Sequence, residues 1–324
     1  MKLAILDDWF DTLRSLPCFA KLAGLDVTVF TDHEPDNGKL AQQLRPFDAI
    51  VLFRERTAIM GELLDQLPNL KLISQRSVYP HVDVEACTRN SVLLCSNMHA
   101  GAPSYAAAEH TWALIMASIR QIPQQMAHMQ AGHWQMGVGK TLRGRCLGLY
   151  GYGRIAKTVA GYADAFGMPV IWWGSEEGRA RAKADGKRLA ENREAFFSSA
   201  DVVSLHVRLK PETRGLITAA DLGAMHPDAL FVNTSRAGLI EPGAMLAALN
   251  AGRPGCAALD VFDQEPITWP NDPLATHPNL ICTPHIGFVT EDEFELQFSD
   301  IFDQVVAFQA GAPIHMINEG VWRA

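Results

Sequence analysis

The stretch CLGLYGYGRIA at 146–156 constrains the fold of this chain more than any other part of the sequence. It begins with a short apolar run, and Gly151 and Gly153 follow where a phosphate-binding turn needs backbone without side chains. From Ile155 onward, apolar residues recur at helical spacing, which predicts a helix whose open N-terminus faces a pyrophosphate. The stretch therefore predicts a strand, a turn and a helix that bind a nucleotide through Gly151, Gly153, Arg154 and Ile155.

Strand and helix patterns alternate on both sides of this stretch, which predicts an α/β protein with two doubly wound parallel-sheet domains. A length of 324 residues suits about two domains, each with a sizeable core. The last predicted helix is expected to return to the first domain. Apolar runs predict strands at 3–6, 27–30, 49–53, 70–74, 146–150, 169–173, 201–207, 229–233, 256–259 and 280–283. Helical spacing predicts helices at 13–22, 61–67, 155–166, 216–225, 244–249 and 292–310.

A long segment at 102–122 is apolar on nearly all sides, so we expect a buried helix that connects the two domains. Pro103 near its start and Pro123 just past its end agree with these limits. The glycine-containing segment at 124–142 breaks the periodicity and is expected to form an arm or loop.

The composition restricts the class of protein. The chain has 28 basic and 36 acidic residues, and the net charge of −8 argues against nucleic-acid and anionic-membrane partners. Asp7 and Asp8 come too early for a signal peptide, and no apolar run approaches the ~20 residues of a membrane helix, so a cytoplasmic protein is expected. The six cysteines are scattered, which predicts buried free thiols, and the histidine spacing predicts no metal site.

Three short stretches, VNTSRAG, ALDVFDQEP and CTPHIG, contain or directly follow the ends of predicted strands of the second domain. Each places one polar side chain at the edge where ligands bind in parallel sheets: Arg236, Glu265 and His285. Taken singly, each also has an ordinary explanation: a solvated cation, a surface acid and a loop histidine.

Taken in order after the glycine turn, these stretches resemble the D-isomer-specific 2-hydroxyacid dehydrogenase family. The resemblance extends over most of the chain and includes LRGRCLGLYGYGRIA, DVVSLHVRLKPETRGLI, NTSRAGLI, AALDVFDQEP and TPHIG. It implies a flavodoxin-like substrate domain made of residues 1–98 and 287–324, with a Rossmann-type NAD(P)-binding domain at 99–286 inserted into it. It also implies a cleft between the two domains and a homodimer.

The resemblance also implies roles for the three polar residues. Reduction of a 2-oxo acid needs an anchor for the carboxylate and a proton donor for the carbonyl oxygen. Arg236 would hold the carboxylate through its planar fork, and His285 would give the proton. Glu265 would hold His285 and favour its charged form. The cofactor would contact Asp260, at its nicotinamide amide, and two further residues, His206 and Thr234.

One departure from the family concerns the cofactor. The family's usual acid at the end of the second nucleotide strand is replaced by Gly174, followed by Ser175. Losing that acid removes repulsion against a 2′-phosphate, and Arg208, where proline is common, could reach such a group. The balance favours NADP over NAD. Nearby side chains of both signs act in opposite directions: Arg179 and Arg181 favour the phosphate, while Glu176 and Glu177 oppose it.

A second departure lies in the first domain. The family's glycine-rich loop for the substrate carboxylate is replaced by SQRSVYPHVD, which contains no glycine. We expect the backbone amides of Ser77 and Val78 to serve instead, with Arg76 as a second positive contact. The alternative for Arg76 is a solvated loop residue, and Arg54 is a weaker candidate.

The sequence thus predicts an NAD(P)-dependent oxidoreductase that acts on a small 2-oxo or D-2-hydroxy acid of the glyoxylate or hydroxypyruvate type. One alternative is a 3-phosphoglycerate dehydrogenase, which the short segment after the last helix disfavours because a regulatory domain would not fit there. A dinucleotide-sensing corepressor or scaffold of the same fold, as in the C-terminal-binding proteins, is the other alternative.

Overall fold

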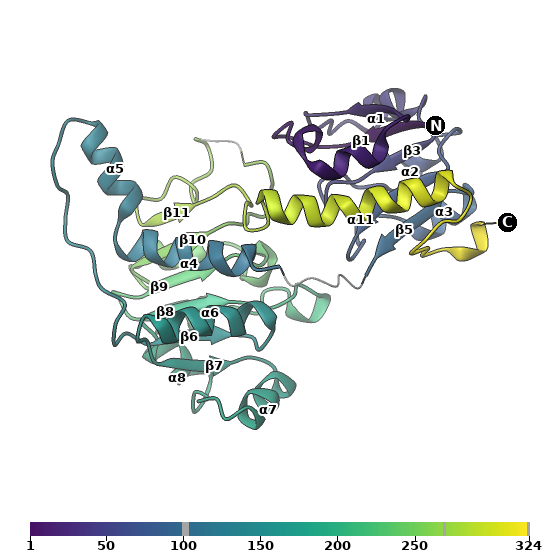
Figure 1. Cartoon of the computed structure of the whole chain (residues 1–324). Coiled ribbons are helices and arrows are strands. Elements are labelled where there is room, and N and C mark those ends of the chain that lie inside the picture. Colours follow the sequence, from purple (N-terminus) through teal and green to yellow (C-terminus); the bar gives the residue numbers. More distant parts are fainter. Residues whose placement is uncertain (99–103, 268–269, 323–324) are drawn as a thin grey trace. The chain divides into compact units, whose positions relative to one another are not determined.

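The structure, a computed structural model, describes residues 1–98, 104–267 and 270–322 of the chain (Figure 1). The chain forms two compact units. Unit 1 consists of Met1–Pro103 and Val289–Ala324, and unit 2 consists of Ser104–Phe288.

Unit 1 contains a five-stranded parallel sheet in the order β2-β1-β3-β4-β5. This is the order of flavodoxin-like sheets, in which the strand order reverses at the neighbouring strands β1 and β3. The register pairs Leu3 of β1 with Val27 on one side and with Ala49 on the other. Continuous apolar runs form these strands because helices cover both faces of the sheet. The strands are β1 Lys2–Ile5, β2 Asp26–Val29, β3 Ala49–Val51, β4 Leu72–Arg76 and β5 Leu93–Asn97.

Helices α1 (Asn37–Leu44), α2 (Gly61–Leu64) and α3 (Val84–Arg89) pack on one face of this sheet. The other face is covered by α11 (Glu291–Gln309), which packs against β4 and β5 (Figure 1). Phe53, after β3, lies 5.0 and 4.8 Å by ring centroids from Phe294 and Phe298 of α11. The last helix therefore completes the core of unit 1, as expected. Three short 3-10 helices are η1 Leu13–Ser15, η2 Pro17–Leu22 and η5 Glu319–Val321.

Unit 2 contains a six-stranded parallel sheet in the order β11-β10-β9-β8-β6-β7. Leu189 forms an isolated parallel bridge to Trp172 of β7, at the outer edge of the sheet. With this bridge counted as a strand, the order begins 3-2-1-4-5-6, which is that of dinucleotide-binding sheets. The Rossmann-type fold expected from the glycine turn is confirmed. The strands are β6 Leu147–Tyr150, β7 Val170–Trp173, β8 Val202–Leu205, β9 Leu230–Asn233, β10 Cys256–Leu259 and β11 Leu280–Cys282.

Helices cover both faces of this second sheet. On one face, α4 (Ala106–Ile119) and α6 (Arg154–Ala165) pack together over the sheet, with α7 (Glu176–Ala184) beside them. On the other face lie three shorter helices, and successive strand residues such as Val202 and Val203 point to opposite faces. The shorter helices are α8 Arg193–Ser199, α9 Ala219–Ala224 and α10 Ala244–Asn250; two 3-10 helices are η3 Pro211–Thr213 and η4 Ala237–Leu239.

Two of the helix predictions were wrong in form. Residues 13–22 form two 3-10 helices instead of one α-helix, because Pro17 begins the second and has no N–H for a continuous α-helical ladder. The connecting helix ends at Ile119, since Gln121 adopts the left-handed conformation at φ +55°. Pro123 lies in the first turn of a further helix, α5 (Ile122–Gln130), so only part of the expected arm is irregular. The predicted helix start at 102 and Pro103 lie outside the described residues.

Candidate functional site

The glycine turn of unit 2 is required by close backbone packing at Gly151. This residue follows β6 at φ +110°, and a Cβ there would lie 2.2 Å from the carbonyl oxygen of His206. Gly174, after β7, has φ +149°, and a Cβ there would lie 3.3 Å from the nitrogen of Gly151. The backbone segments that follow β6, β7 and β8 are therefore packed directly against one another, and no side chain fits at Gly151.

Gly153 is different, because nothing among the described residues requires a glycine there. Its backbone is extended, and a Cβ would meet no atom of these residues within 4 Å. Gly153 is the N-cap of α6 and makes no side-chain capping bond, so the first N–H groups of the helix stay open. Open space before an uncapped helix N-terminus is what the pyrophosphate of a dinucleotide needs, and the site fits this group. Arg154 and Ile155 begin α6, where the Arg154 guanidinium donates to the carbonyl of Ser104.

The residues after β7 would meet the adenosine end of a dinucleotide. The Ser175 hydroxyl caps α7, because its Oγ accepts the N–H of Gly178 at 3.2 Å. The Arg179 guanidinium lies 4.3 Å from the ring centroid of Trp173, the last residue of β7. Arg181 pairs with Glu177 along the exposed side of α7, with 3.7 Å between Nε and Oε1. Of the two predicted arginines on α7, Arg179 is thus the one stacked beside the strand end.

Two predicted cofactor residues follow β8. His206 approaches Ser204, with 2.9 Å between Nε2 and Oγ, and its carbonyl packs on Gly151. Burial lowers the pKa of His206 to about 4, so this imidazole is neutral at pH 7. Arg208 lies two residues further on and is exposed.

The loop after β9 carries Thr234 and Arg236 and is organised by Asn233, a fully buried residue that the sequence reasoning did not select. The Asn233 side chain accepts the N–H of Ser235 and donates to the carbonyl of Arg236, both at 2.9 Å. The Thr234 hydroxyl lies 2.7 Å from that of Thr111 on α4. Half-buried Arg236 thus extends from a loop whose backbone is fixed on both sides of it.

His285 and Glu265 form a close pair. The distance between His285 Nδ1 and Glu265 Oε2 is 2.6 Å, and each side chain is 31% exposed. The second oxygen, Oε1, accepts the N–H of Phe262 at 2.8 Å, which fixes the carboxylate. His285 adopts φ +54°, a strained conformation for a residue with a side chain. Because Nδ1 faces Glu265, Nε2 is the ring nitrogen left for another partner.

Asp260, after β10, holds the segment that carries His285. Its Oδ1 accepts from Thr283 Oγ1 at 2.5 Å and from the N–H of Ile286 at 2.9 Å, and its Oδ2 accepts the N–H of Gly287 at 2.8 Å. Burial raises the pKa of Asp260, but hydrogen bonds from His110, Thr283 and Ile286 outweigh burial and leave this pKa below its usual value. Both carboxylate oxygens are used within the chain, so a contact to the nicotinamide amide stays a prediction.

His110 of α4 is a site residue that the sequence reasoning missed. Its Nε2 lies 3.2 Å from Asp260 Oδ1 and 2.9 Å from Thr283 Oγ1. No local motif marks His110, because its partners belong to segments far away in the sequence.

The predicted residues of unit 2 share one edge of the sheet. Most candidate cofactor residues follow β6, β7 and β8, while Thr234 follows β9 and Asp260 follows β10. The catalytic candidates follow β9, β10 and β11 on the same side of the sheet order. The carboxyl ends of parallel strands lie at one edge, where ligands bind in such folds.

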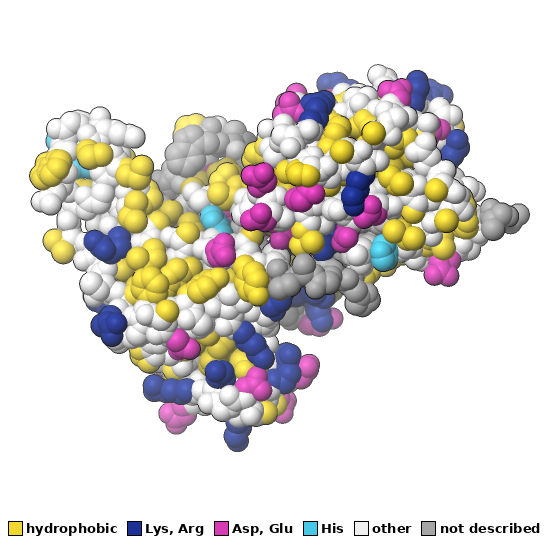
Figure 2. Space-filling model, viewed as in Figure 1, with side chains coloured by type: hydrophobic (Ala, Val, Ile, Leu, Met, Phe, Trp, Pro, Cys, Tyr) yellow, Lys and Arg dark blue, Asp and Glu magenta, His cyan; other side chains and the backbone are white. Residues whose placement is uncertain are grey.

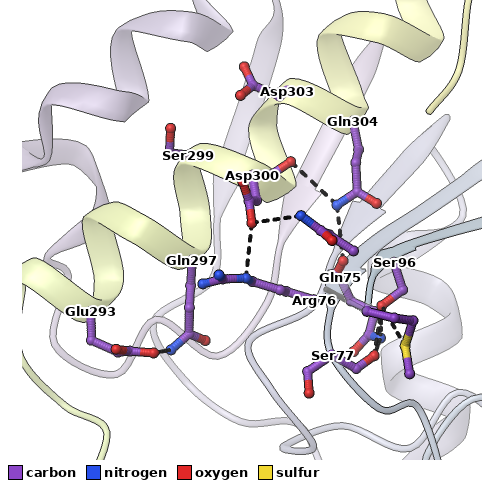
Figure 3. A network of polar contacts seen from close by, with 12 residues as sticks. Gln75, Arg76, Ser77, Ser96, Glu293, Gln297, Ser299, Asp300, Asp303 and Gln304 are labelled. Carbon is purple, nitrogen blue, oxygen red and sulfur yellow. Dashed lines mark hydrogen bonds and ion pairs between the residues drawn. The ribbon is translucent and has the colours of Figure 1, made fainter. Parts of the chain in front are cut away.

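In unit 1, the predicted substrate residues lie at the carboxyl end of β4, where Arg76 is the last strand residue and Ser77 and Val78 follow (Figure 3). Arg76 is 7% exposed, and its Nε lies 3.0 Å from Oδ2 of Asp300 on α11, so it is not a solvated loop residue. Ser77 has φ +75°, and its N–H donates to the carbonyl of Asn97 at 3.1 Å, so this amide is already used within the chain. Val78 is 37% exposed, and within the described ranges its N–H has no partner.

Comparisons with known proteins agree with this geometry. Residues 112–287 match the model of the D-isomer specific 2-hydroxyacid dehydrogenase, NAD binding domain. A Ralstonia solanacearum structure, provisionally assigned as a D-3-phosphoglycerate dehydrogenase oxidoreductase, is similar with a TM-score of 0.95 and 44% identity, covering 100% of this chain and 98% of the other. The glyoxylate reductase of Aeropyrum pernix is 34% identical over 91% of this chain and 90% of its own length.

The D-3-phosphoglycerate dehydrogenase of Methanocaldococcus jannaschii is also 34% identical over 82% of this chain, which spans about half (51%) of that longer protein. Across the part of the chain that the structure describes, no helix is both long and apolar enough to span a membrane. With a matched nucleotide domain and relatives of this class along nearly its whole length, the chain belongs to the D-isomer specific 2-hydroxyacid dehydrogenase family and is an oxidoreductase with a nicotinamide cofactor.

Proposed function

We propose that this protein reduces a small 2-oxo acid to the D-2-hydroxy acid, with His285 as the proton donor and Arg236 as the carboxylate anchor. The contact of 2.6 Å between His285 Nδ1 and Glu265 Oε2 carries this proposal. It supports a donor with a defined orientation, since Glu265 occupies Nδ1 and the proton leaves from Nε2 to the carbonyl oxygen of the substrate. The nicotinamide supplies the hydride when it is bound.

Arg236 suits its proposed role because a planar guanidinium can donate two parallel hydrogen bonds to a carboxylate. Its loop is fixed by Asn233, so the backbone from which the side chain extends is in place before substrate binds. In unit 1, the N–H of Val78 is the proposed second donor to the carboxylate. Arg76 and Ser77 have partners within unit 1: Arg76 pairs with Asp300, and the Ser77 N–H donates to the carbonyl of Asn97.

We further propose that the cofactor is NADP. The pair Gly174 and Ser175 leaves no carboxylate at the end of β7, and Arg179 stacks on Trp173 beside it. Arg208 is exposed after β8, and Lys and Arg side chains gather around α7 in Figure 2. These cations favour a 2′-phosphate, although Glu176 and Glu177 add opposite charge in the first turn of α7.

The substrate we propose is of the glyoxylate or hydroxypyruvate type, a reaction named for the Aeropyrum pernix relative. A second candidate is 3-phosphohydroxypyruvate, the oxidised form of 3-phosphoglycerate, because the Ralstonia solanacearum structure has the higher identity. The small acids are favoured by the buried ion pair of Arg76 with Asp300 at the proposed substrate loop of unit 1.

The test is to follow oxidation of NADH and NADPH by the purified protein with glyoxylate, hydroxypyruvate, pyruvate and 3-phosphohydroxypyruvate. We expect turnover of the small acids and a higher kcat/KM for NADPH. Tight binding of the nucleotide with no turnover of any acid would replace this function with the sensing or scaffold role. A higher kcat/KM for NADH would overturn the cofactor proposal alone.

We also propose a cytoplasmic homodimer. All six cysteines are free thiols, which suits a reducing compartment. Helix α5 has no buried residue, and apolar side chains gather over it in Figure 2. The exposed apolar residues on α5 and the segment after it are Ile122, Met126, Met129, Trp134 and Val138. Such a surface fits a second copy of the chain.

A further inference from the structure

Arg76 lies at the carboxyl end of β4, where the proposed function places the substrate loop. Its side chain is 6% exposed, and its Nε contacts Oδ2 of Asp300 at 3.0 Å. Asp300 is on α11 and is 30% exposed, so the two opposite charges meet where water has limited access (Figure 3). An ion pair of this kind interacts strongly, and removing one partner leaves an uncompensated buried charge.

Polar side chains around the pair hold it in place. Asn97 at the end of β5 donates to Asp300 Oδ2 at 3.1 Å, which fixes the carboxylate from a second side. Gln75 donates to the carbonyl of Ser77 at 2.9 Å, and Ser96 donates to the same carbonyl at 2.7 Å. Gln304 of α11 then donates to the carbonyl of Gln75 at 3.0 Å. The left-handed turn at Ser77 is therefore set by side chains of β4, β5 and α11.

Among the described residues, the acid that pairs with Arg76 is Asp300, which balances its charge. Gln297, one turn before Asp300, accepts a hydrogen bond from Arg54 at 3.5 Å and donates one to Glu293 at 2.7 Å. The neutral amide of Gln297 thus links Arg54 to an acidic residue of α11. A substrate with a second anionic group would meet the Asp300 carboxylate together with the arginine.

We propose that Asp300 determines the charge class of the substrate, because it neutralises Arg76 and so restricts the enzyme to 2-oxo acids with a single negative charge. A second carboxylate or a phosphate on the substrate would have to compete with Asp300 for the guanidinium. This inference rests on the proposed function, since it assumes that the β4 loop faces the substrate. It makes Asp300 a specificity-determining residue that acts through Arg76.

The test compares Asp300→Asn with Asp303→Asn. Asp303 lies on the same helix, is half exposed and pairs with Lys21. Its substitution therefore removes one negative charge from α11 at a position that does not contact Arg76 (Figure 3). For each variant, kcat/KM is measured for monoanions (glyoxylate, hydroxypyruvate) and dianions (2-oxoglutarate, oxaloacetate), together with the more highly charged 3-phosphohydroxypyruvate. We expect Asp300→Asn to raise the ratio of dianion to monoanion kcat/KM about tenfold, mainly through KM, and Asp303→Asn to leave it unchanged.

A second measurement covers the case in which the variant is poorly active. Asp300→Asn leaves Arg76 as an unpaired buried cation, so 2-oxoglutarate should raise the Tm of this variant more than that of the parent protein. The double variant Arg76→Gln with Asp300→Asn should lose both the changed ratio and the extra rise in Tm.

The outcomes separate the two proposals. If no variant turns over any acid, the proposed function fails, and the melting experiment still tests the pairing of Arg76 with an anion. The inference is wrong if the parent protein already prefers dianions. It is also wrong if Asp300→Asn changes neither the ratio nor the response of Tm, or if Asp303→Asn has the same effect.

Discussion

At the scale of single residues, the site depends on side chains whose partners fix a loop. Asp260 accepts from Thr283 and from the backbone of the segment that ends at Gly287. Asn233 accepts from the N–H of Ser235 and donates to the carbonyl of Arg236. Neither residue needs to touch the substrate to influence catalysis. They set the positions of Arg236, the proposed carboxylate anchor, and His285, the proposed proton donor, and misplacement by about 1 Å can cost a hundredfold in rate.

Arg236→Ala should abolish turnover while leaving nucleotide binding nearly intact. The carboxylate anchor would be lost, while the glycine turn and the residues after β7 would keep their geometry. Activity and NADPH binding, the latter by fluorescence titration, should be measured side by side, with Arg188→Ala as the control because Arg188 is an exposed arginine of the same unit. If binding falls as much as activity, Arg236 is a structural residue.

His206 predicts a pH dependence of stability. Its folded pKa of about 4 lies below the ordinary value of 6.5, so between these values the unfolded chain binds more protons than the folded chain. Stability from this residue is therefore complete above pH 6.5 and falls as the pH decreases toward 4. Since His206 is only partly buried by surface area, the loss should be about 1–3 kcal/mol. Urea unfolding from pH 4 to 7 should show a weaker pH dependence for His206→Gln, and an unchanged slope would contradict this origin.

At the scale of elements, the two glycines of the glycine turn are expected to have different roles, one in folding and one in nucleotide binding. Gly151→Ala should destabilise the fold by about 3 kcal/mol or more, because its Cβ would meet the carbonyl of His206 and its φ is positive. Gly153→Ala should change stability by less than about 1 kcal/mol and weaken NADPH binding at least tenfold. Melting curves and nucleotide titrations of both variants check this. Equal loss of stability in the two would show that Gly153 is needed by the chain itself.

The sequence predicted elements where one local signal decides the structure. Buried parallel strands read as continuous apolar runs, so all strands proposed from such runs exist, with ends moved by up to two residues. Local spacing failed at 13–22, where Pro17 interrupts the ladder. It also failed at α5, which has no buried residue and therefore no buried face that would show as a periodic apolar pattern. It also gave no prediction for β5 or for α1, α3, α7 and α8.

The residues of the candidate site also differ in whether the sequence could predict them. The loops with Arg236, Glu265 and His285 could be proposed because each follows a strand end with a distinctive motif. The pairing of Arg76 with Asp300 could not, because it joins β4 to a helix from the other end of the chain. The same holds for His110 and Asp260, whose contact needs α4 packed on the sheet of unit 2.

At the scale of the whole molecule, the apolar surface of α5 predicts self-association. The double substitution Met126→Glu with Met129→Glu should convert the proposed dimer to a monomer, because both side chains are more than half exposed in the single chain and would be buried by a partner. Sedimentation equilibrium gives the mass directly. Val306→Glu, on the exposed side of α11, is the control and should leave the dimer unchanged. A parent protein that sediments as a monomer would disprove the dimer.

The division of unit 1 between the two ends of the chain has a consequence for synthesis on the ribosome. Helix α11 covers one face of the first sheet, yet it is made only after all of unit 2 has emerged. Residues 104–288 are contiguous and can reach their final structure first, whereas Phe53 and the β4 strand stay uncovered until Phe294 and Phe298 arrive. The nascent first sheet is therefore the part of this protein with the longest exposure to chaperones and to aggregation during translation.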